Sequence, residues 1–326
     1  MIRTAVGRKK IVVVGSSNTD MVIKLARIPR PGETVLGGDF FMAAGGKGAN
    51  QAVAAARAGG DVTFIARVGD DEFGCRAVAG FVRDRIWVKY VVRDQKAPSG
   101  VALIFVASDG ENSIAVASGA NSKLSPADIR KAKSAIAQAD VLLMQLEIPM
   151  KTVKEAARLA SEAGVPVVLN PAPAQLLSDD LLQRVTVLTP NETEAEFLTG
   201  IRIKKRSDLA RVADRLLSLG LKAVLITLGA KGVYVGTAQK KKIVPTFKVR
   251  PVDSTAAGDA FNGALAVALA ENRPLLDAAR FANSAAALST TRMGAQPSLP
   301  RRREIENIMI RHKGGRKNEM ASLRSP

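Results

Sequence analysis

The sequence predicts an α/β protein of three layers, with a mostly parallel central sheet and helices on both of its faces. Short apolar runs without alternation are typical of strands that are buried on both faces. Alanine-rich or amphipathic stretches of helical length separate these runs. Two β-rich stretches do not fit this alternation, and they predict a small additional sheet.

The predicted elements follow one another along the whole chain. In the N-terminal half, residues 11–15 and 62–66 are candidate strands, and residues 48–58 form an alanine-rich helix between them. The C-terminal half is more regular, because apolar runs and amphipathic stretches alternate there without interruption. Its predicted strands are 141–144, 165–169, 185–188 and 223–227, and its predicted helices are 125–138, 151–163 and 208–219.

The two β-rich stretches are residues 33–43 and 100–116, with turn residues at 37–38 and 108–112. We expect both to be hairpins outside the main sheet. Together they would form a β-sheet lid within about residues 21–43 and 98–118. Additional edge strands of the main sheet are the alternative.

The composition is that of a globular protein with a large core. The chain has 326 residues, of which 47% are hydrophobic and 24% charged. Its single cysteine, Cys75, can form no internal disulfide, which suits a reducing cytoplasm. No apolar stretch is long enough for a signal peptide or a membrane span. We expect one α/β domain over residues 9–312, with basic, disordered ends at 1–8 and 313–326.

The net charge of +18 raises the possibility of nucleic-acid binding. Residues 1–10 contain four basic and no acidic side chains, and residues 301–326 contain eight basic and three acidic ones, so the ends carry half of the net charge. Aromatic residues make up only 4%, too few for a surface on which bases stack. We expect no specific nucleic-acid partner, although nonspecific binding to polyanions stays open.

Asp259 is a candidate general base. The single histidine, His312, excludes a Ser-His-Asp triad, so proton transfer needs a carboxylate or a lysine. Asp259 follows Ala256, Ala257 and Gly258 at the start of an alanine-rich helix. It could cap that helix. Alternatively, the small residues leave the first N–H groups open to a phosphate, and Asp259 acts as a base beside this anion hole.

A glycine turn near the front of the chain feeds a second helix. In the run Ala44-Gly-Gly-Lys-Gly-Ala-Asn-Gln-Ala52 it brings Lys47 and Asn50 close to a helix N-terminus. The turn is not a Walker loop, because Phe41 stands where the first glycine is required and a glycine follows Lys47. A simple strand-to-helix turn is the alternative.

Three motifs occur in order along the chain: Gly-Gly-Lys-Gly-Ala-Asn-Gln at 45–51, Pro-Asn-Glu-Thr-Glu at 190–194 and Ala-Ala-Gly-Asp at 256–259. Together they resemble the ribokinase branch of the PfkB carbohydrate-kinase family, over about residues 11–300. The runs at 15–20, 142–147, 170–174, 226–229 and 294–298 belong to the same resemblance.

The resemblance implies ATP-dependent phosphorylation of D-ribose at O5, giving D-ribose 5-phosphate and ADP. A kinase for deoxyribose, another sugar or a nucleoside is the alternative, and a non-catalytic binding regulator is a third possibility. Asp259 would be the general base, and the N–H groups of Ala256, Ala257, Gly258 and Asp259 would form the anion hole. The implied sugar contacts are Asn18, Asp20, Gly46, Lys47, Asn50, Glu147 and Asp259.

The same resemblance implies the partners ATP, Mg²⁺ and K⁺ and a homodimer formed through the lid. The implied nucleotide contacts are Asn191, Thr227, Gly229, Lys231, Gly232, Gly258 and Asn283. Glu194 would hold Mg²⁺ through water, and a monovalent cation would bind at Asp253, Thr255, Ser289, Arg292, Gly294 and Ser298. Two positions depart from the family pattern: Asn283 stands where many relatives have histidine, and Ala260 where they often have Thr or Ser.

Overall fold

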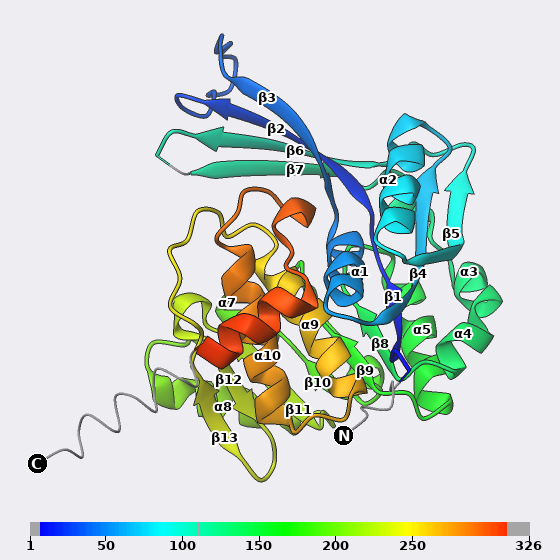
Figure 1. Ribbon diagram of the computed structural model, residues 1–326, viewed down its shortest axis with the longest axis vertical. Coiled ribbons are helices and arrows are strands. Elements are labelled where there is room, and N and C mark those ends of the chain that lie inside the picture. The colour runs from blue at the N-terminus through cyan, green and yellow to red at the C-terminus, as the bar shows by residue number, and fades with distance from the viewer. Residues whose placement is uncertain (1–6, 110, 312–326) are drawn as a thin grey trace, which may run out of the picture.

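A nine-stranded sheet forms the centre of the computed structural model, which describes residues 7–109 and 111–311 (Figure 1). The strand order is β13-β12-β11-β10-β9-β8-β1-β4-β5. All neighbours are parallel except β11, β12 and β13, which pair antiparallel at one edge. The strands are β1 (Lys10–Val14), β4 (Asp61–Gly69), β5 (Trp87–Asp94), β8 (Val141–Met144), β9 (Val167–Leu169), β10 (Val187–Leu188), β11 (Ala223–Thr227), β12 (Val233–Gly236) and β13 (Lys241–Val244).

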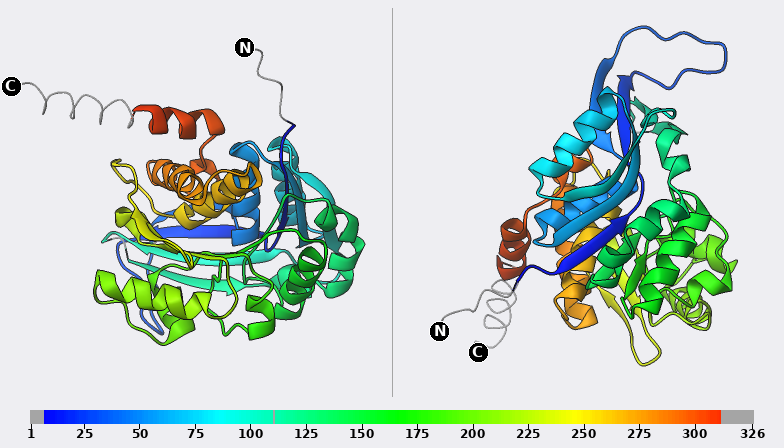
Figure 2. Two further views of the ribbon diagram at one scale, coloured as in Figure 1. Left: turned by 90° about the horizontal axis from the view of Figure 1, so that it is seen from below. Right: turned by 90° about the vertical axis from the view of Figure 1, so that its right-hand side faces the viewer.

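Helices cover both faces of this sheet, as the view along the layers in Figure 2 shows. Ile11 and Val13 pack on one side, and Val12 and Val14 pack on the other, because successive side chains of a strand point to opposite faces. The first face is covered by α1 (Lys47–Arg57), α2 (Glu72–Arg83), α9 (Ala257–Ala270), α10 (Leu275–Ser289) and the helical residues 302–311. The second is covered by α3 (Pro126–Lys131), α4 (Lys133–Ala137), α5 (Met150–Glu162), α6 (Asp179–Leu182), α7 (Glu192–Thr199) and α8 (Arg206–Leu217).

A separate four-stranded sheet, called the small sheet below, lies over the carboxyl ends of the main strands (Figure 1). Its order is β3-β2-β6-β7, with β2 and β6 parallel and the outer pairs antiparallel. The strands are β2 (Asn18–Leu25), β3 (Asp39–Gly45), β6 (Gly100–Ala107) and β7 (Asn112–Ala117). The predicted fold class is therefore confirmed, including the additional sheet.

Several predicted elements differ in detail from the structure. Residues 33–43 do not form a hairpin of their own, because β3 begins at Asp39 and pairs with β2. The apolar pattern did not indicate β2, since apolar and polar residues alternate in this strand only in part. The helix expected at 125–138 is divided into α3 and α4 at Ala132. No predicted strand corresponds to β2, β5, β12 or β13, and no predicted helix corresponds to α2, α6, α7 or α10. The hairpin expected at 100–116 is correct.

Short 3₁₀ segments complete the described chain: η1 (Gly119–Lys123), η2 (Gly229–Lys231) and η3 (Gln296–Ser298). Within residues 7–109 and 111–311, none of the helices combines the length and apolar character that crossing a bilayer would need. The predictions for the basic ends concern residues that lie almost entirely outside the described ranges.

Candidate active site

Asp259 lies in the first turn of α9, beneath the small sheet. Ala256, which precedes the helix, has a left-handed backbone with φ of 59°, and no side chain caps the first turn. Asp259 turns away from its own backbone and accepts hydrogen bonds from Asn50 Nδ2 at 3.0 Å and Gln51 Nε2 at 2.9 Å. The capping interpretation is therefore wrong. Apart from the Ala257 N–H, which donates to the Ser254 carbonyl, the first N–H groups of the helix stay available for an anion.

Asp259 is buried, with 7% of the residue exposed. Burial raises the pKa of Asp259 above its usual value, and the charge of Lys47 and the amides of Gln51 and Asn50 act in the opposite direction. A raised pKa makes a carboxylate a better proton acceptor, which suits a general base.

The glycine turn places Lys47 beside this carboxylate. Gly46 has a φ of 85°, and a Cβ atom there would lie 2.7 Å from the Asn18 nitrogen, so only glycine fits. The Lys47 N–H donates to Glu147 Oε2 at 2.9 Å, and Ser16 Oγ donates to the same oxygen at 2.5 Å. Burial alone would lower the pKa of Lys47, but surrounding carboxylates raise it above its usual value. They are Asp259, Glu147, Glu194 and Asp20.

Asp20, on β2, completes the cluster of acids. Burial and the neighbouring charges of Glu147 and Asp259 raise the pKa of Asp20 to about 7, against the opposing effect of Lys47. A Cβ atom at Gly45 would lie 2.1 Å from Asp20 Oδ2, so the glycine makes room for this carboxyl group. Asp20 lines a cleft of about 810 Å³ between the small sheet and the loops at 252–255 and 293–295.

Asn18, at the start of β2, is 7% exposed and accepts a hydrogen bond from Asn121 Nδ2 at 2.7 Å. Asn50 is 5% exposed, and its Oδ1 atom has no hydrogen-bond partner in the described part of the chain. The predicted sugar contacts thus come together from β2, the start of α1, the end of β8 and the start of α9.

The predicted nucleotide contacts come from the N-terminus of α7, the end of β11 and the loop after it, the start of α9, and α10. Asn191 and Thr227 are joined by an isolated parallel bridge. Asn191 also forms a capping box with Glu194, in which each side chain accepts the other's backbone N–H. Gly229 and Gly232 have φ values of 54° and 99°, which gives the loop around Lys231 its sharp turns. Burial raises the pKa of Glu194 above its usual value, while the Asn191 N–H and Lys47 act against this.

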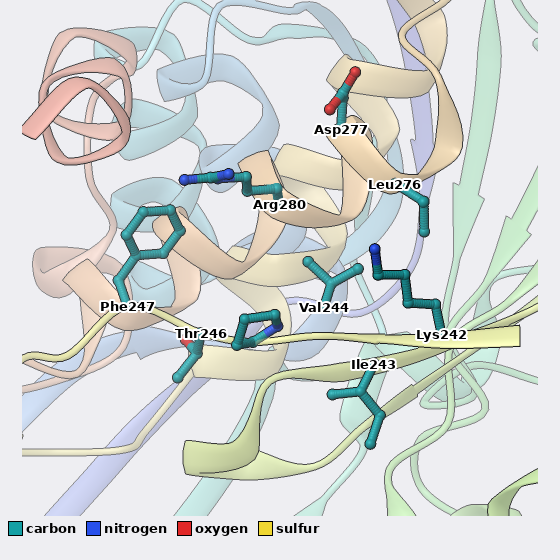
Figure 3. Close-up of a pocket in the computed structure, with 9 residues that line it drawn as sticks. Lys242, Ile243, Val244, Thr246, Phe247, Leu276, Asp277 and Arg280 are labelled. Carbon is teal, nitrogen blue, oxygen red and sulfur yellow. The ribbon is translucent and has the colours of Figure 1, made fainter. Parts of the chain in front are cut away.

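Asn283 is buried and supports a neighbouring segment of chain. Its Nδ2 donates to the carbonyls of Val244 at 2.9 Å and Pro245 at 3.3 Å. This segment and the N-terminal half of α10 line a pocket of about 330 Å³ (Figure 3), in which the Arg280 guanidinium lies 5.7 Å from the centre of the Phe247 ring. The amide nitrogen of Asn283 is therefore committed to the protein backbone.

The predicted cation residues come from two loops that the structure brings together. Asp253 Oδ1 accepts the Thr255 N–H and Oδ2 accepts the Gly294 N–H, both at 2.8 Å. Burial works against ionisation of Asp253, but these hydrogen bonds lower its pKa below the usual value. The N–H groups of Val252 and Asp253 also donate to the Thr290 carbonyl, which ties the two loops further. Ser289, at the end of α10, and Ser298, in η3, are fully buried, whereas the Arg292 side chain turns to Glu304.

The model of the pfkB family carbohydrate kinases matches residues 8–302. The chain belongs to this family. The ribokinase of Haemophilus influenzae is 47% identical over 297 residues, which are 91% of this chain and 97% of that protein. The deoxyribokinase of Salmonella typhi is 36% identical, over 89% of this chain and 95% of its own. The structure of Arabidopsis thaliana ribokinase complexed with ribose and ATP is 33% identical, with a TM-score of 0.85, and the match covers 92% of this chain and 98% of that one.

Sequence reasoning missed part of this pfkB-family site. Gln51 donates a hydrogen bond to Asp259, and Ser16 donates one to Glu147. Gln145 and Asn170 are hydrogen-bonded to Gln51. The available signal was position, because Gln145, Asn170 and Ser16 closely follow apolar strands and Gln51 follows Asn50. Polar residues at the carboxyl ends of parallel strands meet at one edge of the sheet.

Proposed function

We propose that this chain transfers the γ-phosphoryl group of ATP to O5 of D-ribose, giving D-ribose 5-phosphate and ADP. Relatives named as ribokinases support the substrate, and the Arabidopsis protein, whose structure contains ribose and ATP, supports both partners. The observation that carries the proposal is Asp259, a buried carboxylate held by two amides inside an uncapped helix N-terminus.

Asp259 is the proposed base. As O5 bonds to the γ-phosphorus, its proton passes to the Asp259 carboxylate, and the bond from the γ-phosphorus to ADP breaks with its electron pair leaving on ADP. The N–H groups of Ala256, Gly258 and Asp259 are the proposed donors to the transferring group. The Ala257 N–H, which donates to the Ser254 carbonyl at 3.2 Å, must give up this contact to join them.

The proposed sugar site is the end of the cleft beneath the small sheet. Carboxylates and amides surround it, and such groups bind hydroxyls and reject analogues that lack them. The small sheet is proposed as a lid, because residues of β2, β3 and β6 line the cleft from above. Closing it would exclude water from the transfer. The proposed sugar contacts are Asn18, Asp20, Gly46, Lys47, Asn50 and Glu147.

ATP is proposed to approach along Thr227, Gly229, Lys231 and Gly232, with Asn191 and Gly258 as further contacts. Since the Asn283 amide nitrogen holds Val244 and Pro245, we assign it to shaping this side of the site. Phosphoryl transfer from ATP uses Mg²⁺, which neutralises charge on the phosphates.

Glu194 is the proposed protein group for Mg²⁺, and its environment fits a hydrated ion. No three His, Cys, Asp or Glu side chains are grouped as a metal site in residues 7–109 and 111–311, so direct coordination by a protein cage does not fit. Glu194 Oε2 accepts the Asn191 N–H, which leaves Oε1 for a metal-bound water.

K⁺ is proposed to bind beside the anion hole, between the loops that Asp253 joins. The donor set fits a hard cation, because one carboxylate and several backbone carbonyls of Asp253, Thr255, Ser289, Arg292, Gly294 and Ser298 come from segments already held together. A cation there would order the turn that receives the phosphoryl group.

A homodimer through the small sheet is proposed from its surface. Its residues alternate between the cleft and the opposite face, called the far face below. On the far face Phe40, Met42 and Leu103 are 60%, 45% and 47% exposed. Such an apolar surface is typical of an interface.

The exposed free cysteine, Cys75, suggests a reducing compartment, so we propose the cytoplasm.

The basic ends are proposed to be accessory. A chain trimmed to residues 9–312 should keep its kinase activity and lose most of any salt-sensitive binding to polyanions. Activity assays and heparin retention compare the two lengths, and a trimmed chain that is inactive would show that the ends belong to the catalytic unit.

A coupled assay of ADP release tests the proposed function. Ribose, deoxyribose, fructose and adenosine are compared by kcat/KM at equal ATP and magnesium. We expect ribose to be the best substrate. Deoxyribose as the best one would place the chain with the Salmonella relative, and adenosine or fructose would contradict the pentose assignment while leaving the phosphoryl transfer intact.

A further inference from the structure

A chain of buried amide side chains connects Asp259 to the ends of three strands. Gln51 Nε2 donates to Asp259 Oδ1 at 2.9 Å and to Asn170 Oδ1 at 3.0 Å. Gln145, which follows β8, donates from Nε2 to Gln51 Oε1 at 2.6 Å. Asn170, which follows β9, donates from Nδ2 to the carbonyl of Thr189, just after β10, at 3.0 Å. Gln51 and Gln145 are fully buried, so water does not compete for these contacts.

The two ends of this chain determine how each amide is oriented. The Thr189 carbonyl can only accept, so Asn170 must direct its NH₂ group to Thr189 and its oxygen to Gln51. Gln51 must then direct its own NH₂ group to Asn170, and the second hydrogen of this group reaches Asp259. If the Gln51 amide rotated by half a turn, its oxygen would face the oxygens of Asp259 and Asn170. Its NH₂ group would then face the NH₂ group of Gln145.

We propose that Gln51 is a positioning residue, which keeps Asp259 Oδ1 as a permanent acceptor so that Oδ2 alone takes the proton of the sugar hydroxyl. This inference rests on the proposed role of Asp259 as the base. In the transfer, the hydroxyl proton moves to Oδ2 while the hydroxyl oxygen bonds to the γ-phosphorus and ADP leaves with the electrons of the broken bond.

Asn50 is the adjustable partner of the second oxygen. Its Nδ2 donates to Asp259 Oδ2 at 3.0 Å, whereas its own Oδ1 is buried and has no hydrogen-bond partner in the described ranges. Half a turn of this amide would direct Oδ1 at the newly protonated Oδ2 and let it accept that proton in a hydrogen bond. The two amides therefore have different parts: Gln51 is fixed by its neighbours and Asn50 can respond.

The charges around Asp259 determine the direction of the expected pH effect. Burial raises its pKa, Lys47 and the two amides lower it, and Glu147 raises it. The other charged groups that interact with Asp259 are Asp20 from β2 and Glu194 from α7. Removing the Gln51 donor should raise the pKa of Asp259 further. Because the base must be ionised, the acid limb of the rate profile should then move to higher pH.

The test is the pH dependence of phosphoryl transfer in single turnover, so that product release does not mask the chemical step. For Gln51→Met we expect the acid limb to move up by about one to two pH units, since a hydrogen bond to a charged group is lost. Gln51→Glu places a second carboxylate beside Asp259 and should move the limb at least as far. KM for ribose should change little in either variant. Gln145→Met, which removes the donor to Gln51 Oε1 and so loosens the Gln51 amide, should give a smaller shift in the same direction.

Thr152→Val is the matched control. The Thr152 hydroxyl is also fully buried and donates to the Leu124 carbonyl at 2.7 Å, on the opposite side of the main sheet. This variant should lower Tm and leave the acid limb in place. The positioning role would be overturned if the acid limb stays in place in the two Gln51 variants. If those variants fail to fold, an unshifted acid limb in Gln145→Met would overturn it.

Asp259→Asn separates this inference from the function on which it rests. Turnover near that of the wild type in Asp259→Asn would remove the base and the inference together. An inactive Asp259→Asn combined with unshifted limbs in the Gln51 variants would overturn the positioning role alone.

Discussion

The two sheets of this kinase differ in how their faces are covered. In the main sheet, helices pack on both faces, and all residues of β8 and β9 are buried. In the small sheet every residue of β7 is exposed, and β3 is buried only at its end, where it joins the glycine turn. Covered strands hold the polar groups at their ends in fixed positions, whereas an uncovered sheet presents apolar surface to whatever approaches it.

This difference corresponds to the two parts of the proposed function. The rigid part contains Asp259, Gln51 and Glu147, whose hydrogen-bond partners all come from the edge of the main sheet and from α1 and α9. The small sheet adds Asn18 and Asp20 from β2, at the point where the two sheets meet. We therefore expect changes at the main-sheet edge to affect chemistry, and changes on the small sheet to affect sugar binding and assembly.

The largest effect is expected for Asp259→Asn. Loss of general-base assistance should lower kcat by about 10²–10⁴-fold, while calorimetry should still detect binding of ribose and ATP. Asp208→Asn is the matched control, because Asp208 is also a buried carboxylate in a first helical turn, where it accepts the N–H groups of Lys204 and Lys205. The control should lose stability and keep its kcat. A kcat of Asp259→Asn within a few-fold of the wild type would contradict the role of base.

Asp20→Asn tests the place where the sheets meet. Above pH 7, where Asp20 is ionised, losing one charged hydrogen bond to the sugar should lower kcat/KM for ribose by about 10–100-fold. Asp109→Asn, at the exposed tip between β6 and β7, is the control on the same sheet and should behave as the wild type. Equal kcat/KM in Asp20→Asn and the wild type would remove Asp20 from the sugar site.

The same variant should change the pH dependence of stability. The folded protein keeps a proton on Asp20 up to about pH 7, whereas the unfolded chain releases it near 3.8. The free energy of unfolding should therefore fall as the pH rises through this interval. Without ligands, Asp20→Asn should remove this contribution and have the higher Tm above pH 7. Thermal unfolding from pH 4 to 8 measures it, and parallel Tm profiles for both proteins would argue against the raised pKa.

Potassium should raise the rate of phosphoryl transfer several-fold, a smaller effect than those of Asp259→Asn and Asp20→Asn. We expect it to act between the two loops that Asp253 joins. Initial rates in potassium should exceed those in a bulky organic cation at equal ionic strength, because an ion between the two loops orders the anion hole. Asp253→Ser should lose this response, since Asp253 holds both loops. Equal rates of the unmodified chain in both salts would contradict the cation site.

The smallest effect on catalysis is expected from the far face of the small sheet. Met42→Glu should dissociate the proposed dimer, because a charge in an apolar interface is costly, and should change kcat far less than Asp259→Asn does. Val82→Glu, at an exposed apolar position on α2, is the control and should leave the oligomeric state unchanged. Light scattering distinguishes the outcomes, and a Met42→Glu protein that stays dimeric would move the interface elsewhere.

Much of the fold could be predicted from local patterns. The strands at 141–144 and 223–227 have the predicted bounds, because continuous apolar runs are distinctive when both faces of a sheet are buried. The strand β2 was missed, since the polar residues Asn18 and Asp20 of the proposed sugar site interrupt its apolar pattern. The turn residues at 37–38 suggested a hairpin within 33–43. A local turn signal gives no information on which distant strand will pair, and β3 pairs with β2 instead.

The sequence by itself determined the family, the layered α/β architecture and the motifs around Lys47, Asn191 and Asp259, because each depends on residues that are close together in the chain. Only the tertiary structure decided what Asp259 touches, since Gln51 is 208 residues away and their contact depends on how α1 packs beside α9. The same holds for the pKa of Asp20. Burial and two carboxylates from distant segments raise it, and neither burial nor distance can be calculated from residue order.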